Sequence, residues 1–492
     1  MVLGANGVGS RSPLDALSLR ATRCEETKKL LDNPCPAALR SDDGRAPKEG
    51  RPMARKPDLS RVSFYVSCLV LAFGYGVGVG AYQLFPYALL KFGLDSVRSV
   101  FEEAPTLSGV RPEEFLQPAR HDGRGVTVLE PDRMAPGLTM VSGFFDDGNE
   151  VRLIAEDGTP VRRWPVRFSE IFPDPTHLAG TGRIPSTDWN TDIHGALAHP
   201  DGSIVFNFEY LGMVKLDRCG AVQWTVPRMT HHSISPSSGG GYWVPGRIFT
   251  ETLEGYPPAG QPYMDDQILE IAPDGTVLTE VSVSELFRRN ELFSLLVTGS
   301  WETFPRDGGE TAHLNDIEEL PDSLADRFPT FSPSDLILSF RHRNLLMVVD
   351  SRTWEVQWHR TGPWIRQHDP DFTPRGTISV FNNNSDDTFL GTLLGGSNIL
   401  ELDPVSGIVT TSYAPRSGQE MHTSLRGKHQ ILPNGNLLVT QFEAGRLFEV
   451  DGNGEVVWEY VNRYDEDEVA ELTGAIRYPL DYFRVDDWSC EG

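Results

Sequence analysis

The sequence predicts an all-β protein, a six-bladed β-propeller preceded by one transmembrane helix and a disordered cytoplasmic N-terminus. Three observations predict this fold. From about residue 135 onward, a pattern of two apolar β runs joined by a tight turn recurs six times. A second two-strand pattern precedes most of these copies, so the repeating unit has four strands. Ahead of the repeats, residues 62–90 contain no charged residue.

The N-terminal segment, residues 1–61, is polar, low in aromatic residues and rich in Arg, Asp and Pro, so we expect it to be disordered. The uncharged stretch 62–90 exceeds the roughly 20 apolar residues that a helix needs to cross a bilayer. A buried core helix or a late signal peptide is the alternative. The polar segment in front of it is too long for an ordinary signal peptide, which favours a membrane anchor.

The charges beside this stretch predict its orientation. Five basic residues crowd its N-terminal flank, namely Lys48, Arg51, Arg55, Lys56 and Arg61, whereas the other flank mixes basic and acidic residues. By the positive-inside rule, residues 1–61 are expected in the cytoplasm and the rest of the chain outside it. We therefore expect a single-pass membrane protein with a signal-anchor at 62–90, a stalk at 91–133 and the propeller at 134–492.

Each of the six repeated segments is typical of a β-hairpin, because Asp-Gly and Asn-Gly steps favour tight turns between strands. The segments are "VRLIAEDGTPVRRW", "GMVKLDRCGAVQW", "QILEIAPDGTVLTEV", "LLMVVDSRTWEVQW", "NILELDPVSGIVTTSY" and "RLFEVDGNGEVVWEY". A pair of β-sandwiches or an irregular β-solenoid is the alternative. The strand pairs recur too regularly, and over too long a span, for one sandwich.

Composition excludes some functions. The formal net charge of −25 opposes non-specific nucleic-acid binding through a basic surface, so no nucleic-acid partner is expected. The five cysteines are widely spread, with no CxxC pair and no dense disulfide framework. Whether Cys219 and Cys490 pair is left open by the sequence.

Histidines recur at one position of the repeat. The first strand of each propeller blade lines the central channel, and the residues just before it lie at the channel mouth, where ligands bind. His194 and His368 each lie eight residues before the glycine of the following turn. His232 has the same spacing, although adjacent glycines leave one residue of slack, so either His231 or His232 faces the channel.

In a fourth repeat, counting back from Pro321 places Asn315 in this position. His313 lies two residues earlier, and alternate strand residues share a face, so His313 and Asn315 can point the same way. A single histidine here could simply bond to a neighbouring carbonyl. Several titratable side chains that meet in one cavity indicate a functional site.

Two kinds of chemistry suit a ring of histidines. Imidazole is a common zinc ligand, but the sequence has no HExxH or CxxC motif, so no metal is expected. A neutral imidazole is also a nucleophile near pH 7 that can carry a phosphoryl or sulfuryl group. Arg341, expected within a strand, offers the planar fork that suits the oxygens of such a group. Asp369 follows His368 directly, and its negative charge is expected to raise the pKa of that histidine.

Four segments resemble a known family: "AHLND" (312–316), "SFRHRN" (339–344), "QHDPDFTPRGTISVFNNN" (367–384) and the closing "HQILPNGNLLVTQFEAGRLFEVDGNGEVVWEY". They are similar to the arylsulfate sulfotransferases (arylsulfotransferases), and the resemblance covers about 190–462. It implies a six-bladed propeller that works without a nucleotide donor or other cofactor. It also implies a ping-pong reaction, in which the sulfuryl group of a phenolic sulfate ester moves to a histidine and then to an acceptor phenol.

The resemblance also implies residue roles. His368 would become sulfated, and His313, Asn315 and Arg341 would hold the sulfuryl oxygens. His232, or His231 beside it, would assist the leaving phenol, and His194 and His231 are expected to contribute to substrate binding. Two alternatives remain: a non-catalytic propeller that binds an anion or a partner at the cell envelope, and a metal- or quinone-dependent oxidoreductase. The latter is weaker because the repeats lack an obvious ligand set.

Overall fold

The computed structural model describes residues 59–82, 85, 111–146, 148–250, 263–296, 310, 312–386 and 388–490. The chain forms two compact units, Met1–Tyr87 and Ala88–Gly492, and each is described by itself. The predicted disordered tail therefore lies outside the described residues, except for its last three positions. The N-terminal half of the predicted stalk, up to residue 110, lies outside them as well.

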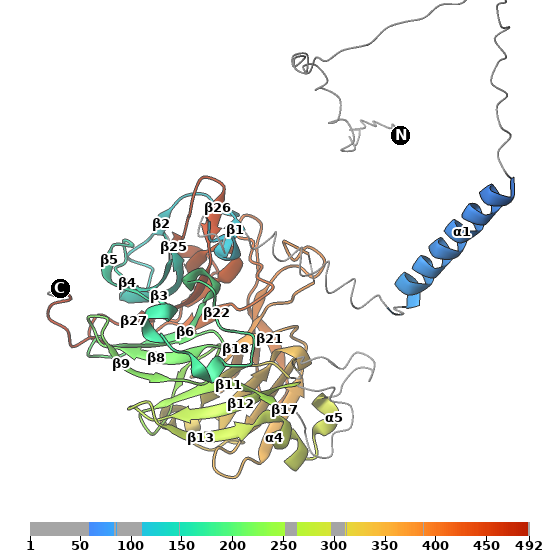
Figure 1. Ribbon diagram of the computed structural model, residues 1–492. Coiled ribbons are helices and arrows are strands. Elements are labelled where there is room, and N and C mark those ends of the chain that lie inside the picture. Colours follow the sequence, from blue (N-terminus) through green and yellow to red (C-terminus); the bar gives the residue numbers. More distant parts are fainter. Residues whose placement is uncertain are drawn as a thin grey trace, which may run out of the picture. The chain divides into compact units, whose positions relative to one another are not determined.

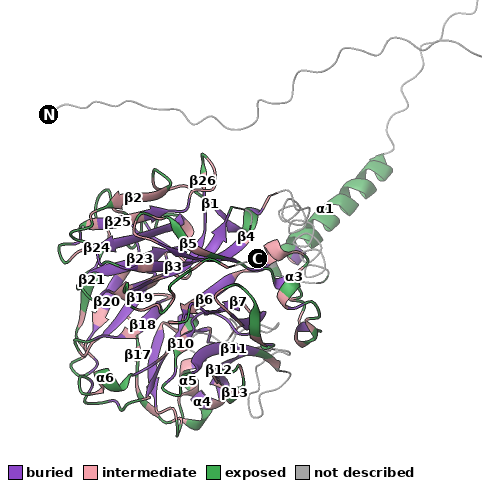
Figure 2. Ribbon diagram, turned by 90° about the vertical axis from the view of Figure 1, so that its left-hand side faces the viewer, coloured by how far each residue is buried: buried purple, intermediate pink, exposed green. Residues whose placement is uncertain are grey.

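The first unit contains one long helix, α1 (Leu59–Tyr82). Its 24 residues span about 36 Å at 1.5 Å per residue, enough to cross the hydrocarbon core of a bilayer. Residues Leu59–Gly80 have a mean hydropathy of 1.8, and Figure 2 shows the helix almost wholly exposed. The helix begins three residues before the predicted start at 62, and Phe85 already lies in a turn. By length and composition α1 is thus a candidate membrane span.

The second unit is a six-bladed β-propeller, as predicted (Figure 1). Five blades are antiparallel sheets of four strands and blade 6 has a fifth; apart from that fifth strand, the strands follow in sequence order, except that the last strand of the chain opens the first blade. From the innermost strand outward, blade 1 contains β27 (Leu472–Tyr478), β3 (Leu138–Phe145), β4 (Gly148–Ile154) and β5 (Pro160–Pro165), and blade 2 contains β6 (Ile193–Ala198), β7 (Ile204–Phe208), β8 (Gly212–Leu216) and β9 (Val222–Val226). Blade 3 contains β10 (Ser235–Pro236), β11 (Tyr242–Thr250), β12 (Tyr263–Ile271) and β13 (Val277–Ser282), and blade 4 contains β14 (Leu314–Glu319), β15 (Leu336–Phe340), β16 (Leu345–Val349) and β17 (Val356–Thr361). Blade 5 contains β18 (His368–Phe372), β19 (Ile378–Asn382), β20 (Asn398–Leu402) and β21 (Val409–Tyr413), and blade 6 contains β22 (Lys428–Ile431), β23 (Leu437–Gln441), β24 (Arg446–Val450) and β25 (Val456–Val461).

Short helical turns connect the strands or cover their ends. They are η1 (Glu113–Phe115), α3 (Phe168–Ile171), η2 (Thr176–Leu178), η3 (Asp188–Asn190), α4 (Val283–Arg289), α5 (Phe293–Leu296), α6 (Asp322–Ala325), η5 (Arg341–Arg343) and η6 (Phe442–Ala444).

The second and third strands of the blades are buried on both faces, because each blade is packed between two others. In blade 4, every residue of β15 and β16 is buried. The outermost strand β17 instead alternates between half-buried and exposed positions, which accounts for its mixed sequence "VQWHRT". Hydrophobic clusters fill the spaces between blades, as between β16 and β19 around Leu346 and Val380.

The ring is closed by pairing the two ends of the propeller sequence. The C-terminal strand β27 pairs with β3 from Leu472 to Tyr478 and so completes blade 1. Two further strands, β1 (Leu116–Pro118) and β2 (Gly125–Leu129), lie within residues 111–133, which were expected in the stalk. In the structure β1 pairs with β26 (Glu468–Ala470), and β2 adds a fifth strand to blade 6. This part of the predicted stalk is therefore built into the propeller.

A disulfide bond joins Cys219, in the turn between β8 and β9, to Cys490. It holds the C-terminal tail against blade 2, where the Arg218 side chain donates a hydrogen bond to the carbonyl of Ser489 (2.9 Å). Trp488 packs edge-on against Trp164. The structure thus answers the pairing question that the sequence left open.

Candidate functional site

The sequence-predicted histidines meet at one end of the propeller channel. The innermost strands of blades 2, 4 and 5 all begin at this end, so His194 in β6, His313 just before β14 and His368 at the start of β18 converge there. His232 lies at the centre of the group. Its ring centroid is 4.7 Å from that of His194, 4.9 Å from that of His313 and 6.1 Å from that of His368.

The structure distinguishes the two adjacent histidines. His231 points its Nε2 at the carbonyl of Gly246 (3.1 Å), and its Nδ1 lies 2.8 Å from the Nδ1 of His232. His232 instead directs its Nε2 to the Nε2 of His313 (3.2 Å). His232 is therefore the one that faces the channel, and His231 supports it from behind. Gly195 makes room for this arrangement, because a Cβ there would lie 2.0 Å from the carbonyl oxygen of His232.

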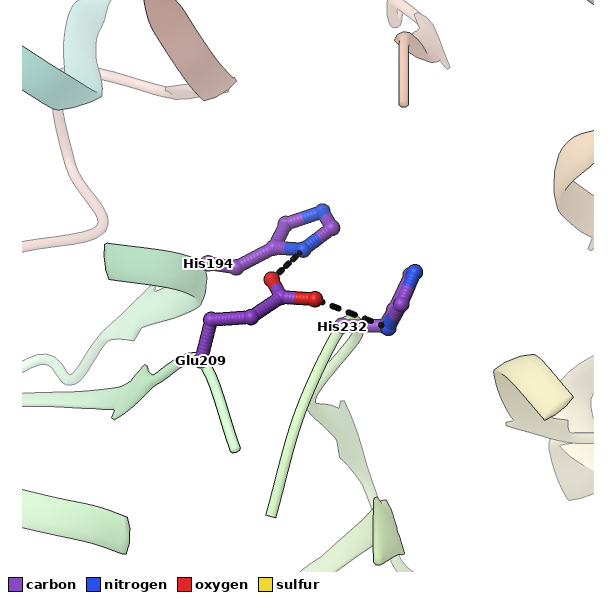
Figure 3. Close-up of side chains that lie close together, drawn as sticks. All are labelled: His194, Glu209 and His232. Carbon is purple, nitrogen blue, oxygen red and sulfur yellow. Dashed lines mark hydrogen bonds and ion pairs between the residues drawn. The ribbon is translucent and has the colours of Figure 1, made fainter. Parts of the chain in front are cut away.

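Glu209, which was not among the sequence-predicted site residues, joins two of the histidines. Figure 3 shows its carboxylate between His194 and His232: Oε2 lies 2.5 Å from His194 Nδ1, and Oε1 lies 3.4 Å from His232 Nδ1. Arg426 approaches the same carboxylate to 3.5 Å. Burial alone would raise the pKa of Glu209, but His194 and Arg426 outweigh it and hold that pKa far below its usual range. Glu209 is thus a fixed negative charge inside the site.

A second carboxylate, Glu310, contacts His313 at Nδ1. Arg247 donates a hydrogen bond from Nη1 to the other oxygen of Glu310 (2.5 Å). Burial would raise the pKa of Glu310, but its contacts with His313 and Arg247 lower it overall. The arrangement orients His313, because its Nδ1 faces the carboxylate while its Nε2 faces His232.

His368 has a different environment. Its Nδ1 lies 2.7 Å from Oδ1 of Asn383 and 3.1 Å from the carbonyl of Arg366, while Nε2 has no hydrogen-bond partner among the described residues. Burial and then the positive charge of Arg341 hold the pKa of His368 well below its ordinary value. The expectation that Asp369 raises this pKa is wrong. Asp369 turns away and binds Lys428 Nζ (2.8 Å) and the backbone N–H of His429 (2.6 Å).

Arg341 lies in the turn η5 directly after β15, not within a strand as expected. Its backbone N–H donates to the carbonyl of His313 (3.0 Å), which fixes it beside the histidines. Its Nη1 donates to Nε2 of His342 (3.3 Å), but its buried Nε–H has no partner among the described residues. Burial lowers the pKa of Arg341, and a buried cation with an unpaired N–H favours an anionic ligand.

Asn315 reaches the backbone of the neighbouring blade. Its side-chain N–H donates to the carbonyl of Gln367 (2.7 Å), the residue before His368, whereas its buried Oδ1 has no partner in the described part of the chain. The side chain therefore contributes to holding the start of β18 in place. The structure brings all the sequence-predicted site residues together, but it gives Asn315 this additional contact.

Three residues of the site occupy the same position in their blades. Glu209, Arg341 and Asn383 each directly follow the second strand of their blades, namely β7, β15 and β19. The sequence predicted Arg341 but not Glu209 or Asn383, because the histidine spacing relates only the first strands of the blades. Alignment of the repeats on the residue after the second strand would have identified all three.

Two groups in the site have the spacing of a metal centre. The ligand atoms of His194, Glu209 and His232 all lie within 4.8 Å of one another, and so do those of Glu310, His313 and His342. Each carboxylate also pairs with an arginine, Arg426 or Arg247, and these positive charges would oppose a bound cation. A cavity of about 400 Å³ is lined by residues of all six innermost strands, among them four carboxylates together with Lys428 and His429.

The sequence profile of the arylsulfotransferase (ASST) family matches residues 195–463, more than half of the chain. The chain belongs to the arylsulfotransferase family. The matched region runs from β6 to the end of blade 6 and includes His232, His313, Arg341 and His368, whereas His194 lies just outside it. No curated protein matches the chain in sequence.

Several solved structures have a weak similarity to this arylsulfotransferase chain. A protein of unknown function from Bacteroides caccae is 13% identical, with 66% of this chain and 94% of that chain covered and a TM-score of 0.42. A catalytically inactive virginiamycin B lyase from Staphylococcus aureus is 11% identical (69% and 89% covered, TM-score 0.37), as is TolB from Acinetobacter baumannii (70% and 68%, TM-score 0.38). Similarity at this level says nothing about function.

Proposed function

We propose that the protein is a membrane-anchored, nucleotide-independent aryl sulfotransferase. It moves a sulfuryl group from a phenolic sulfate ester to an acceptor phenol through a sulfohistidine at His368. The observation that carries the proposal is the environment of His368 within an arylsulfotransferase domain. Its pKa is held well below the ordinary value, and it lies beside the buried Arg341; among the residues that the structure describes, neither Nε2 of His368 nor Nε–H of Arg341 has a hydrogen-bond partner.

In the first half-reaction, Nε2 of His368 attacks the sulfur of the ester. The N–S bond forms and the S–O bond to the aryl group breaks. The leaving phenolate takes a proton from the hydrogen-bonded pair His232–His313, which would start with one proton more than two neutral imidazoles and end neutral. In the second half-reaction, an acceptor phenol returns a proton to this pair while its oxygen attacks the sulfur. Atoms and charge therefore balance over one cycle, and no cofactor is consumed.

Arg341 would neutralise the charge on the sulfuryl oxygens in both transition states, in which these oxygens accept hydrogen bonds. Glu209 and Glu310 would hold His194, His232 and His313 in position, as their Nδ1 contacts support. A non-catalytic propeller would need the arginine to bind an anion, but it would have no use for a buried, neutral nucleophile.

Purified full-length protein is expected to release phenol from a chromogenic aryl sulfate only slowly on its own and rapidly when a second phenol is added. The acceptor phenol should leave as its sulfate ester, which chromatography with mass detection would quantify. If donor and acceptor bind but neither changes, as calorimetry would show, the non-catalytic anion-binding propeller is the correct assignment instead.

The rate should depend on pH through His368. Attack needs the neutral imidazole, so kcat/KM should fall as the pH drops through the pKa of this residue in the free enzyme. Burial together with Arg341, His313 and His194 lowers that pKa, so the acid limb should lie well below pH 6.5. Equal kcat/KM values at pH 6 and pH 7 would agree with this. A midpoint at or above pH 6.5, in a pH range where circular dichroism shows intact fold, would contradict it.

Membrane anchoring through residues 62–90, with the propeller outside the cytoplasm, is also part of the proposal. The apolar helix α1 supports it, as do the basic residues before it. The disulfide Cys219–Cys490 also supports it, because such bonds persist mainly in oxidising compartments. Protease added to intact cells or spheroplasts should digest the propeller. Digestion limited to residues 1–61 would mean that the orientation is reversed.

A further inference from the structure

We infer that Asn383 decides which nitrogen of His368 attacks, by fixing the imidazole as the tautomer with its proton on Nδ1. Asn383 directly follows β19 and its side chain is buried. Its Oδ1 lies 2.7 Å from Nδ1 of His368. The part of the inference that concerns reaction rates depends on the proposed sulfotransferase function, whereas the tautomer itself does not.

The orientation of the Asn383 amide follows from its other contacts. Its Nδ2 donates two hydrogen bonds, to the carbonyls of Thr423 (3.0 Å) and Arg426 (2.8 Å). A carbonyl oxygen can only accept, so the NH₂ group must face these two atoms. The remaining oxygen, Oδ1, must then face His368, where it can only accept. Nδ1 of His368 is therefore a donor and carries a proton.

A second acceptor agrees with this assignment. The carbonyl of Arg366 lies 3.1 Å from the same Nδ1. A bare Nδ1 lone pair would face two oxygen lone pairs in a buried space, which is unfavourable. Because a neutral imidazole has one proton, Nε2 must hold the free electron pair. The nitrogen without a partner is thus also the nucleophilic one.

The chemical type of residue 383 also matters. A carboxylate could accept the Nδ1 proton, but it would raise the pKa of His368 and favour the imidazolium, which cannot attack. It would also set a negative oxygen against the two backbone carbonyls. Only an amide donates to both carbonyls and accepts from His368 without adding charge. His313 has the contrasting arrangement, since its Nδ1 contacts the carboxylate of Glu310.

The test compares Asn383→Leu, which has a similar size but no acceptor, and Asn383→Ala with wild type. Nitrogen-15 spectra of histidine-labelled full-length protein in detergent would give the tautomer, and the His368 signals would be those absent from His368→Gln. We expect the wild-type proton on Nδ1. In both variants the proton should shift toward Nε2, and kcat should fall about tenfold or more with little change in KM.

The matched control is Asn384→Ala, in the same run of asparagines. The Asn384 side-chain amide donates to the carbonyls of Leu394 and Gly396 and does not contact His368 in the structure. In this variant the His368 tautomer and kcat should therefore remain those of wild type. A proton on Nε2 of wild-type His368 would overturn the inference, and so would an Asn383→Leu protein with wild-type kcat and an unchanged tautomer. Absence of turnover in wild type would instead count against the proposed function, because the spectra still decide the tautomer.

Discussion

Replacing His368 with alanine is expected to abolish both half-reactions. His368 Nε2 is the only atom proposed to carry the sulfuryl group, and alanine leaves a space that can hold no covalent intermediate. The neighbouring imidazoles cannot replace it readily, because Nε2 of His232 and Nε2 of His313 face each other and Nε2 of His231 faces the carbonyl of Gly246. We expect turnover to fall to background.

The decisive measurement is mass spectrometry after brief incubation of wild type with donor and no acceptor, under conditions that spare the labile N–S bond. The peptide with residues 366–384 should gain the mass of one sulfuryl group. His359→Ala is a suitable control, since His359 lies exposed on the outermost strand β17 and should keep full activity. His368→Asn should retain the fold. Wild-type turnover by His368→Ala would refute the covalent mechanism.

Replacing Arg341 with alanine should give the second-largest loss. The guanidinium is buried beside the histidines, and its Nε–H has no partner among the described residues, so it is available to the sulfuryl oxygens. Removal of one comparable transition-state donor costs about 100-fold or more in kcat. Arg341→Lys keeps the charge but loses the planar fork, so only part of the activity should return.

Steady-state kinetics with one donor at several acceptor concentrations would measure this loss. Arg352→Ala provides the matched control, because the Arg352 side chain is 75% exposed in the turn after β16 and should be dispensable. If Arg341→Ala raises KM for the donor but leaves kcat unchanged, the arginine only binds the ground state and the proposed role in the transition state is wrong.

Much of the fold could be predicted from the sequence because it depends on local rules. The segment "VRLIAEDGTPVRRW" became the hairpin β4–β5, and the five other copies became the equivalent outer hairpins of their blades. Apolar runs, turn residues and a regular repeat are all properties of neighbouring positions. The same regularity explains why the histidine positions of blades 2 to 5 can be aligned from the sequence.

The boundaries were less predictable, since they depend on distant partners. Residues 116–118 and 125–129 pair as strands with β26 and β25, at the other end of the chain. Likewise, Cys219 and Cys490 are 271 residues apart, and only ring closure brings the C-terminal tail back to blade 2.

The sequence by itself thus determined the repeat, the blade number, the apolar helix and the ring of histidines with Arg341. Only the tertiary structure decided which partner each imidazole has. Glu209 and Glu310 face His194 and His313, and Asn383 faces His368, although all three lie outside the repeat position that holds the histidines. The physical reason is that an imidazole's protonation depends on which side chains the folded strands and their connections place beside it, and spacing from the turn glycines does not record such contacts.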